Sequence, residues 1–199
     1  MEIRSGIDPV KVGVLALQGA FKEHEAVLAR LGAESKEVKV PSDLSGIDAL
    51  VIPGGESTVQ SKLMESSGIF EPLSKLISEG LPVMGTCAGM IICASEVEDG
   101  VLGQKTLAAA RISVRRNAFG RQIHSFEADL EAPVLDPPRF HGVFIRAPLP
   151  ERIDERVEPL AFLAGKPVAV RDRNLFLFAF HPELAGDDRF HLYFLERAK

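Results

Sequence analysis

The sequence is poor in cysteine: Cys87 and Cys93 are the only two in 199 residues. Two thiols cannot form a disulfide framework, and this favours a reducing compartment. No apolar run approaches the length of about 20 residues that crosses a membrane, and the first residues carry no apolar segment of a signal peptide. We therefore expect a protein that works in the cytoplasm and has no membrane partner.

A large excess of either charge is also missing. The chain has 23 Lys and Arg against 28 Asp and Glu, so its net charge is −5, and this value disfavours a nucleic-acid partner. Its content of 46% hydrophobic and 26% charged residues is that of an ordinary globular protein. We find no internal repeat and no low-complexity linker. At this length we predict a single domain spanning residues 1–199, in which residues 1–10 form a short N-terminal extension.

The first half of the chain alternates strand and helix patterns. Residues 12–17 and 49–52 are continuous apolar runs of strand length, which is typical of interior strands in a parallel sheet. Residues 20–31 have one apolar helical face, and residues 37–40 form a more exposed strand. This β-α-β-β order predicts an α/β fold: a three-layer, flavodoxin-like domain with a mostly parallel central sheet flanked by helices.

The pattern changes along the rest of the chain. A helical stripe from residue 59 to 77 is interrupted near residues 66–68, and Gly80 ends it. From residue 106 the helices give way to short β-like runs separated by Pro, Gly and Asp: 106–114, 122–128, 142–145, 159–164, 168–170 and 175–180. We expect these runs to be extra short strands that extend or flank the main sheet. A closing helix is expected at 187–197.

The strongest chemical signal is a cysteine between a strand and a helix. Residues 81–84 predict a buried strand, residues 90–94 predict the start of a buried helix, and Gly-Thr-Cys-Ala-Gly at 85–89 lies between them. Small residues around a nucleophile allow the sharp turn that exposes its side chain. At a helix N-terminus, free amides favour a thiolate and can hold an oxyanion. A buried structural cysteine is the alternative, but the Gly-x-Cys-x-Gly pattern favours Cys87 as a nucleophile.

A glycine-rich loop precedes this motif by one β-α unit. Residues 53–58, Pro-Gly-Gly-Glu-Ser-Thr, follow the strand at 49–52, at the carboxyl end where open α/β sheets bind ligands. The two glycines expose backbone amides, and Ser57 or Thr58 can cap the next helix. Alone, this loop would indicate little more than a helix cap. Its position predicts that it opens on the same sheet edge as Cys87.

One of the five histidines is placed to act as a base for Cys87. His181 follows the most apolar run in the chain, residues 175–180, so a buried strand delivers its imidazole to a strand end. Pro182 favours extended backbone, and in an extended segment Glu183 would point the same way and orient the ring. A strand that simply exits into a turn is the alternative.

The other four histidines carry weaker signals. His24 lies among charged residues on an expected surface helix, so we expect it to be exposed to solvent. His124 and His141 lie in β-like runs and His191 lies in the closing helix, where packing or surface roles are expected.

Three motifs resemble, in order and spacing, those of the triad-type (class I) glutamine amidotransferases. They are 54–57 (Gly-Gly-Glu-Ser), 85–89 (Gly-Thr-Cys-Ala-Gly) and 181–183 (His-Pro-Glu). Within that superfamily the chain looks most like the glutaminases of pyridoxal 5'-phosphate synthases, a likeness carried by further stretches at 15–20, 116–122, 142–148 and 180–184. Ile91, where many amidotransferases have glutamine, points to the same branch. The resemblance covers the chain from about residue 12 onwards.

The resemblance implies a catalytic triad made of Cys87, His181 and Glu183. In it the thiol is the nucleophile, the imidazole is the base that also protonates the departing ammonia, and the carboxylate orients the ring. The backbone amides of Gly55 and Ala88 would hold the oxyanion. Gln18 would lie near this oxyanion loop and the partner interface.

The resemblance also implies where L-glutamine binds. Substrate contacts in similar proteins fall at six positions: Gly55, Glu56, Ser57, Arg116, Ile145 and Arg146. The Arg116 guanidinium suits a bidentate grip on the α-carboxylate of glutamine, whereas Arg146 has an ordinary alternative as a surface salt-bridge residue. No cofactor and no metal are expected.

The expected partner is the synthase subunit of pyridoxal 5'-phosphate synthase, in a large hetero-oligomer. Similar glutaminases hydrolyse L-glutamine to L-glutamate and ammonia, and they are nearly idle until that subunit docks and completes the oxyanion hole. The ammonia passes to the synthase subunit, which makes pyridoxal 5'-phosphate (vitamin B6) from ribose 5-phosphate and glyceraldehyde 3-phosphate.

Three other hypotheses stay open. The first is a glutaminase that serves histidine or purine biosynthesis. The second is a non-catalytic or redox-sensing α/β protein with an exposed cysteine, in which His181 would lie too far from Cys87 for a hydrogen bond. The third is a thiol protease, although no extended peptide-binding segment is evident.

Overall fold

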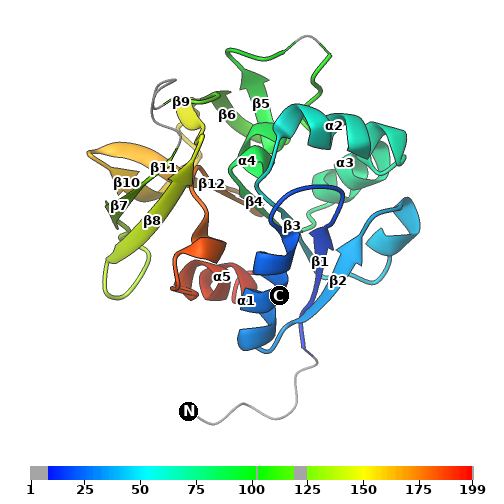
Figure 1. Cartoon of the computed structure of the whole chain (residues 1–199), viewed down its shortest axis with the longest axis horizontal. Helices are drawn as coiled ribbons and strands as arrows, with labels where there is room; N and C mark the ends of the chain where they lie inside the picture. The colour runs from blue at the N-terminus through cyan, green and yellow to red at the C-terminus, as the bar shows by residue number, and fades with distance from the viewer. Residues whose placement is uncertain (1–8, 102, 119–124, 199) are drawn as a thin grey trace.

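A nine-stranded mixed sheet forms the centre of the structure, a computed structural model that describes residues 9–101, 103–118 and 125–198 (Figure 1). In spatial order its strands are β2 (Glu34–Val38), β1 (Lys11–Leu15), β3 (Ala49–Ile52), β4 (Val83–Thr86), β12 (Leu175–Phe178), β11 (Lys166–Asp172), β10 (Glu158–Leu163), β7 (Ser125–Glu131) and β8 (Arg139–Ile145). Pairing is parallel from β2 to β12 and antiparallel from β12 to β8. The predicted α/β fold is confirmed, with its parallel pairing confined to one half of the sheet.

Helices cover both faces of the parallel half. The helices α1 (Phe21–Arg30) and α5 (Arg189–Leu195) lie side by side on one face, whereas α2 (Ser57–Ser66), α3 (Phe70–Ser78) and α4 (Ala88–Cys93) lie on the other (Figure 1). Two short 3-10 helices complete the list: η1 (Pro41–Leu44) follows β2, and η2 (Pro182–Leu184) contacts α1. This three-layer arrangement is that of a doubly wound sheet.

A second sheet has three strands: β5 (Ala94–Val97), β6 (Ala110–Arg115) and β9 (Leu149–Ile153). The sequence indicated only the central one, β6. The two edge strands lack apolar alternation, since β5 exposes Ser95 and Glu96 and β9 contains Pro150. Proline is tolerated at a sheet edge because its missing N–H faces away from the ladder.

Most of the predicted elements are found close to their predicted bounds. The interruption of the helical stripe is real, because α2 and α3 are separate helices with Gly68 at φ +76° between them. The strand expected at 175–180 is β12, which ends at Phe178. Parts of two predictions, the run at 122–128 and the extension at 1–10, lie outside the described residues.

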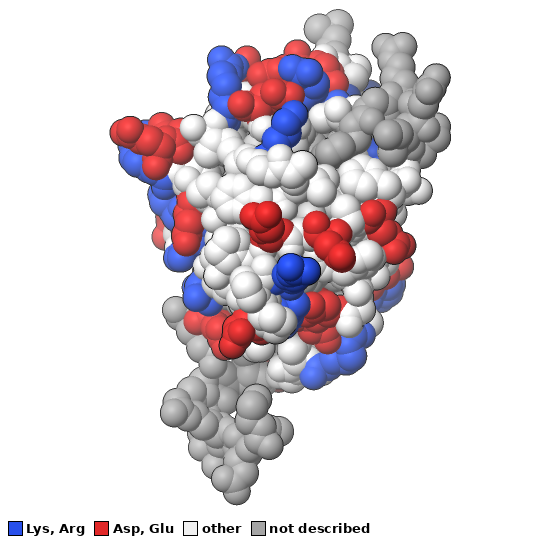
Figure 2. Space-filling model, turned by 90° about the vertical axis from the view of Figure 1, so that its left-hand side faces the viewer, with Lys and Arg blue, Asp and Glu red and all other residues white. Residues whose placement is uncertain are grey.

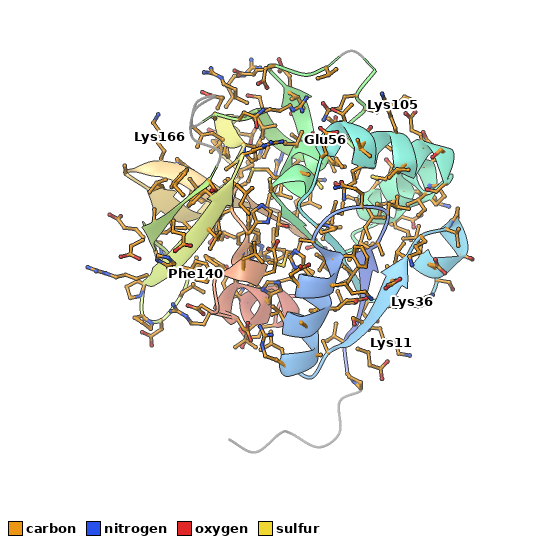
Figure 3. The ribbon with its side chains drawn as sticks, viewed as in Figure 1. Lys11, Lys36, Glu56, Lys105, Phe140 and Lys166 are labelled. Atoms are coloured by element: carbon orange, nitrogen blue, oxygen red, sulfur yellow. The ribbon has the colours of Figure 1, made fainter. Side chains whose placement is uncertain are left out.

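Five buried phenylalanines pack α5 against the sheet. Neighbouring ring centroids lie 4.7 to 5.8 Å apart among Phe140, Phe144, Phe178, Phe180 and Phe190. Phe140, labelled in Figure 3, extends from β8 toward α5. Loss of one such ring typically costs about 3–5 kcal/mol of stability. The cluster therefore fixes the segment that leads from β12 into His181.

Charged side chains of both signs are interspersed on the side of the molecule that Figure 2 shows, where the antiparallel half of the sheet lies. In the described part of this face neither sign dominates, so it does not resemble the basic surface that binds a nucleic-acid backbone. Among the residues that the structure describes, no helix is long and apolar enough to cross a membrane.

Candidate active site

The loops at the carboxyl ends of the parallel strands line a cavity of about 610 Å³. Its wall brings together residues from the separate segments that the sequence singled out: Gly54, Gly55, Glu56, Ser57, Cys87, Arg116, Ile145, Arg146 and His181. The glycine loop and the cysteine turn therefore open on one sheet edge, as predicted. This edge is where doubly wound sheets bind ligands.

Cys87 occupies the sharp turn between β4 and α4. Its backbone has φ 49° and ψ −101°, a conformation that is rare outside glycine and costs about 1–3 kcal/mol. A β-carbon on Gly89 would lie 2.1 Å from the carbonyl oxygen of Ile52, so only glycine lets the turn pack here. The Cys87 amide donates to Phe178 O at 2.8 Å, and its thiol donates to the Ile145 carbonyl with sulfur and oxygen 3.6 Å apart. The strained turn thus presents the sulfur to the cavity.

His181 and Glu183 form a hydrogen-bonded pair beside Cys87. Nδ1 of His181 lies 2.7 Å from Oε1 of Glu183, and both side chains are buried. Burial by itself would lower the pKa of His181, but hydrogen bonds to Cys87 and Glu183 and the attraction of both groups raise it to about 10. Because Nδ1 faces the carboxylate, Nε2 is the nitrogen left to face the thiol.

The backbone of this pair differs from the expected one. We predicted an extended segment in which residues 181 and 183 point the same way, but Pro182–Leu184 is the 3-10 helix η2. Proline is suited to the first position of a helix, where an N–H has no partner anyway. The tight turn, rather than strand alternation, folds the carboxylate onto the imidazole. Cys87 and His181 line the same cavity, an arrangement that favours a catalytic pair over the redox hypothesis.

The glycine loop packs against both His181 and Gln18. A β-carbon on Gly54 would lie 2.3 Å from Cε1 of His181, and one on Gly55 would lie 2.5 Å from Oε1 of Gln18. The Gln18 side chain also accepts a hydrogen bond from the backbone amide of Glu56 at 3.0 Å. Gln18 therefore lies against the loop whose amides face the cavity.

The N-cap of α2 is Glu56, so the expectation of a cap at Ser57 or Thr58 is wrong (Figure 3). The Glu56 carboxylate accepts from the backbone amides of Thr58 and Val59 at 3.3 and 2.8 Å. Ser57 is instead the first residue of the helix, and its hydroxyl accepts from the side chain of Gln104 at 3.0 Å.

Arg116 is held at the cavity wall by two side chains. Its Nη2 donates to Oε1 of Glu56 at 3.3 Å, and its Nη1 donates to Oε1 of Gln104 at 3.2 Å. Sequence reasoning missed Gln104, because the residue belongs to no motif and reaches the site only through folding. The guanidinium is thus oriented by contacts from α2 and from the loop before β6.

Ile145 and Arg146 lie at the end of β8, beside the cavity. Ile145 turns its carbonyl toward Cys87 while its side chain leaves the residue 38% exposed. Arg146 has φ 45°, so the chain turns sharply where the strand stops. Both residues line the cavity, as expected.

The prediction that His24 is exposed to solvent is wrong. Its side chain is fully buried, with Nδ1 2.9 Å from Nε2 of His191 and Nε2 3.2 Å from Oγ1 of Thr86. Charged neighbours suggested a surface position, but His24 shares the buried face of α1 with Val27 and Leu28. That spacing of three and four residues was a signal available in the sequence. Burial lowers the pKa of His24 despite the attraction of a nearby carboxylate.

The remaining histidines fall into the expected roles where they are described. His191 is buried in α5, and burial lowers its pKa to about 3. His141 lies at the surface, 2.9 Å from carboxylate oxygens of both Glu127 and Asp129, which raise its pKa. His124 lies outside the described residues. Within the described ranges no group of three or more His, Cys, Asp or Glu side chains is arranged to hold a metal ion.

Fold and cavity together define a class of protein: a doubly wound α/β protein with a cysteine at a strand-to-helix turn and a His-Glu pair beside it. Residues 14–199 match the SNO glutamine amidotransferase family, and the chain belongs to that family.

Relatives with curated names agree with this assignment. The chain is 52% identical over 191 residues to the pyridoxal 5'-phosphate synthase subunit PdxT of Dehalococcoides mccartyi, covering 96% of this chain and 98% of that protein. It is 56% identical over 188 residues to the subunit of the same name from Pelotomaculum thermopropionicum, covering 94% and 95%. A crystal structure of a glutamine amidotransferase is 51% identical and has a TM-score of 0.89, covering 94% of this chain and 98% of that one.

Proposed function

We propose that this chain is the glutaminase subunit of a pyridoxal 5'-phosphate synthase and hydrolyses L-glutamine to L-glutamate and ammonia in the cytoplasm. One observation carries the proposal: Cys87, at a strained turn, lines the same cavity as His181, whose Nδ1 lies 2.7 Å from Oε1 of Glu183. The identity with two subunits named PdxT supports the choice of synthase.

Cys87 is the nucleophile. The imidazole of His181 takes the thiol proton when the sulfur attacks, and the buried carboxylate of Glu183, which helps to raise the pKa of His181, stabilises the imidazolium that forms. The thiolate attacks the carbon of the glutamine side-chain amide, so that a C–S bond forms while the π electrons of the carbonyl move to its oxygen. The backbone amides of Gly55 and Ala88 hold the resulting oxyanion.

His181 then acts first as an acid and afterwards as a base. Its Nε2–H protonates the amide nitrogen, the C–N bond breaks, and ammonia leaves behind a thioester on Cys87. A water molecule next gives a proton to His181 as its oxygen attacks the thioester, and cleavage of the C–S bond releases L-glutamate. Throughout, Glu183 keeps the ring oriented and stabilises its charged form.

L-Glutamine binds with its α-carboxylate on Arg116, next to the loop at 55–57 and the pair Ile145 and Arg146. Glu56 and Gln104 already orient the guanidinium, so less side-chain freedom is lost when the substrate arrives. A planar guanidinium offers two parallel N–H groups to a carboxylate. This match is the physical support for Arg116 as the residue that selects an α-amino acid.

The ammonia is used by a synthase subunit with which the chain forms a hetero-oligomer. That subunit builds pyridoxal 5'-phosphate from ribose 5-phosphate and glyceraldehyde 3-phosphate. Docking of the partner beside Gln18 completes the oxyanion hole, because Gln18 lies directly against Gly55 and accepts from the next amide. The glutaminase therefore runs when the acceptor of its ammonia is in place.

The test is glutamate release from L-glutamine with and without the synthase subunit, for the wild type and for Cys87→Ala. Strong stimulation by the subunit, lost in Cys87→Ala although the variant still binds the partner, supports both the chemistry and the pathway. Hydrolysis that ignores the subunit would favour a glutaminase of histidine or purine biosynthesis. Absence of hydrolysis in both conditions would overturn the proposal.

A further inference from the structure

Two buried histidines lie behind the Cys-His-Glu triad and take no part in the mechanism above. Nδ1 of His24 lies 2.9 Å from Nε2 of His191. Nε2 of His24 lies 3.4 Å from Oε2 of Glu183 and 3.2 Å from Oγ1 of Thr86. The side chains of His24 and Glu183 are completely buried. Burial of a polar group costs free energy unless the group is hydrogen-bonded, so the burial of these polar side chains calls for a physical explanation.

The contacts indicate which ring nitrogen of His24 and of His191 carries the proton. Oε1 of Glu183 faces Nδ1 of His181, whereas Oε2 has no hydrogen-bond partner within the described residues. A carboxylate only accepts, so the nitrogen of His24 that lies 3.4 Å from it, Nε2, carries the proton. The hydrogen bond of this N–H goes to Oγ1 of Thr86 at 3.2 Å, and its positive end also attracts Oε2 of Glu183. Since burial keeps His24 neutral, its Nδ1 is an acceptor, and Nε2–H of His191 donates to it.

The alternative tautomers, with the proton on Nδ1 of both His24 and His191, agree less well with the surrounding atoms. They would aim a lone pair of His24 at the carboxylate of Glu183. They would also place a proton on Nδ1 of His191, a buried atom that has no hydrogen-bond partner among the described residues. An orphaned N–H is rarer inside proteins than an orphaned acceptor. The donors therefore run in one direction, from His191 through His24 toward Thr86 and the neighbouring carboxylate of Glu183.

We propose that His24 and His191 are positioning residues of the glutaminase: they hold the Glu183 carboxylate, which in turn holds His181. The inference rests on the proposed function, since it assumes that the triad hydrolyses glutamine. Glu183 lies on the short helix Pro182–Leu184, and its buried side chain contacts His181 through one carboxylate oxygen. Nε2 of His24, 3.4 Å from Oε2, attracts the carboxylate on the side that His181 does not contact, and partners behind a catalytic group commonly set its geometry in this way.

The helix α1 also joins this cluster to the oxyanion loop. The amide of Ala20, directly before α1, donates to the carbonyl of Gly54 at 3.1 Å. His24 follows about one helical turn later and reaches Glu183. One rigid element therefore contacts both halves of the site, and this is why a histidine on α1 is well placed to hold the triad.

The test compares two substitutions at His24, each assayed in the complex of this chain with its synthase subunit. In His24→Gln the side-chain amide offers an N–H near the position of Nε2, whereas His24→Leu removes the donor at similar volume. We expect His24→Leu to lower kcat about tenfold to a hundredfold with KM for glutamine unchanged, and His24→Gln to restore most of it. Val27→Ala, on the same buried face, is the matched control: it should lower stability but not kcat.

A double-mutant cycle separates positioning from general stabilisation. If His24 acts through Glu183, His24→Leu should cost little further kcat in a Glu183→Gln background. His191→Leu should also lower kcat, and His191→Gln should restore most of it. An equal loss in both Glu183 backgrounds, or a rise in KM instead of a fall in kcat, would overturn the inference.

The proposed function and this inference fail in different ways. The function fails if the wild-type complex releases no glutamate or if Cys87→Ala still releases it. With an active wild type and an inactive Cys87→Ala, a wild-type kcat in His24→Leu overturns the inference alone. Nitrogen-15 NMR at pH 7 gives a readout independent of activity: His24 and His191 should both be neutral with the proton on Nε2, and a proton on Nδ1 of either would contradict the inference.

Discussion

A β-carbon on Gly54 would lie 2.3 Å from Cε1 of His181, so the glycine loop passes directly against the imidazole of His181. The contact joins the loop after β3 to the end of β12. It leaves no space for any side chain at residue 54, because an added carbon would displace either the ring or the loop. The loop proposed to hold the oxyanion and the proposed base are thus held in one contact.

Replacement of this glycine should impair catalysis. Gly54→Ala is expected to lower kcat by about a hundredfold, the typical cost of moving a catalytic group by about 1 Å. The measurement is kcat with the synthase subunit present, with circular dichroism to establish that the fold is kept. Gly186→Ala is the control: its φ is +69° and nothing lies within 4 Å of an added carbon, so about 1 kcal/mol of stability should be lost with kcat unchanged. A wild-type kcat in Gly54→Ala would show that the imidazole has room to move.

The two cysteines should differ in reactivity. Burial raises the pKa of Cys93 to about 12, so its thiol stays protonated at neutral pH, and no reagent reaches it in the folded state. Iodoacetamide at pH 7.5 should therefore modify Cys87 and spare Cys93, as checked by mass spectrometry of peptides. Both should react in denaturant. Modification of Cys93 in the folded protein, before Cys87, would contradict the assignment of the nucleophile.

Acid should weaken the fold through the buried histidines. Burial lowers the pKa of His24 and of His191, the latter to about 3, whereas an unfolded histidine titrates near pH 6.5. For His191, between about pH 6.5 and 3, the unfolded state binds a proton that the folded state does not, so the free energy of unfolding falls by about 1.4 kcal/mol for each pH unit of acidification. His24 acts in the same direction.

Urea unfolding at pH 7.5 and 5.5 measures this effect. His191→Gln should lose about 1.4 kcal/mol less than the wild type between these pH values, because one titrating group is gone. His141→Gln is the control. Carboxylates raise the pKa of His141, so its contribution is present at low pH and its removal cannot reduce the loss of stability in acid. An unchanged pH dependence in His191→Gln would show that His191 is not buried in a neutral form.

Arg116 should act on substrate affinity. Arg116→Ala is expected to raise KM for glutamine about tenfold to a hundredfold, the usual worth of hydrogen bonds to a charged group, with a smaller effect on kcat. Arg116→Lys keeps the charge but loses the two parallel donors, so it should recover only part of the affinity. Arg115→Ala, at an exposed residue that pairs with Glu98 and Glu151, is the control. An unchanged KM in Arg116→Ala would place the α-carboxylate elsewhere.

Several features of the site were open to prediction because they are local. The turn at Cys87 is encoded by glycines within two residues of it, and the apolar runs on either side predict a strand and a helix. His181 and Glu183 are neighbours, so their pairing followed even though the expected backbone was wrong. The helix cap was missed because Glu56 and the residues after it compete for the same free amides, and the sequence does not decide between them.

The sequence by itself determined the alternating strands and helices of the first half of the chain, the strained cysteine turn, the glycine loop and the His-Pro-Glu segment, since each depends on residues a few positions apart. Only the tertiary structure decided that Gln104 holds Arg116 and that His24 and His191 meet behind Glu183. These contacts join elements far apart in the chain. The charged residues next to His24 in the sequence also led to the wrong prediction that it is exposed. The packing of α1 and α5 on one face of the sheet brings His24 and His191 together behind Glu183, and this packing cannot be predicted from a local sequence pattern.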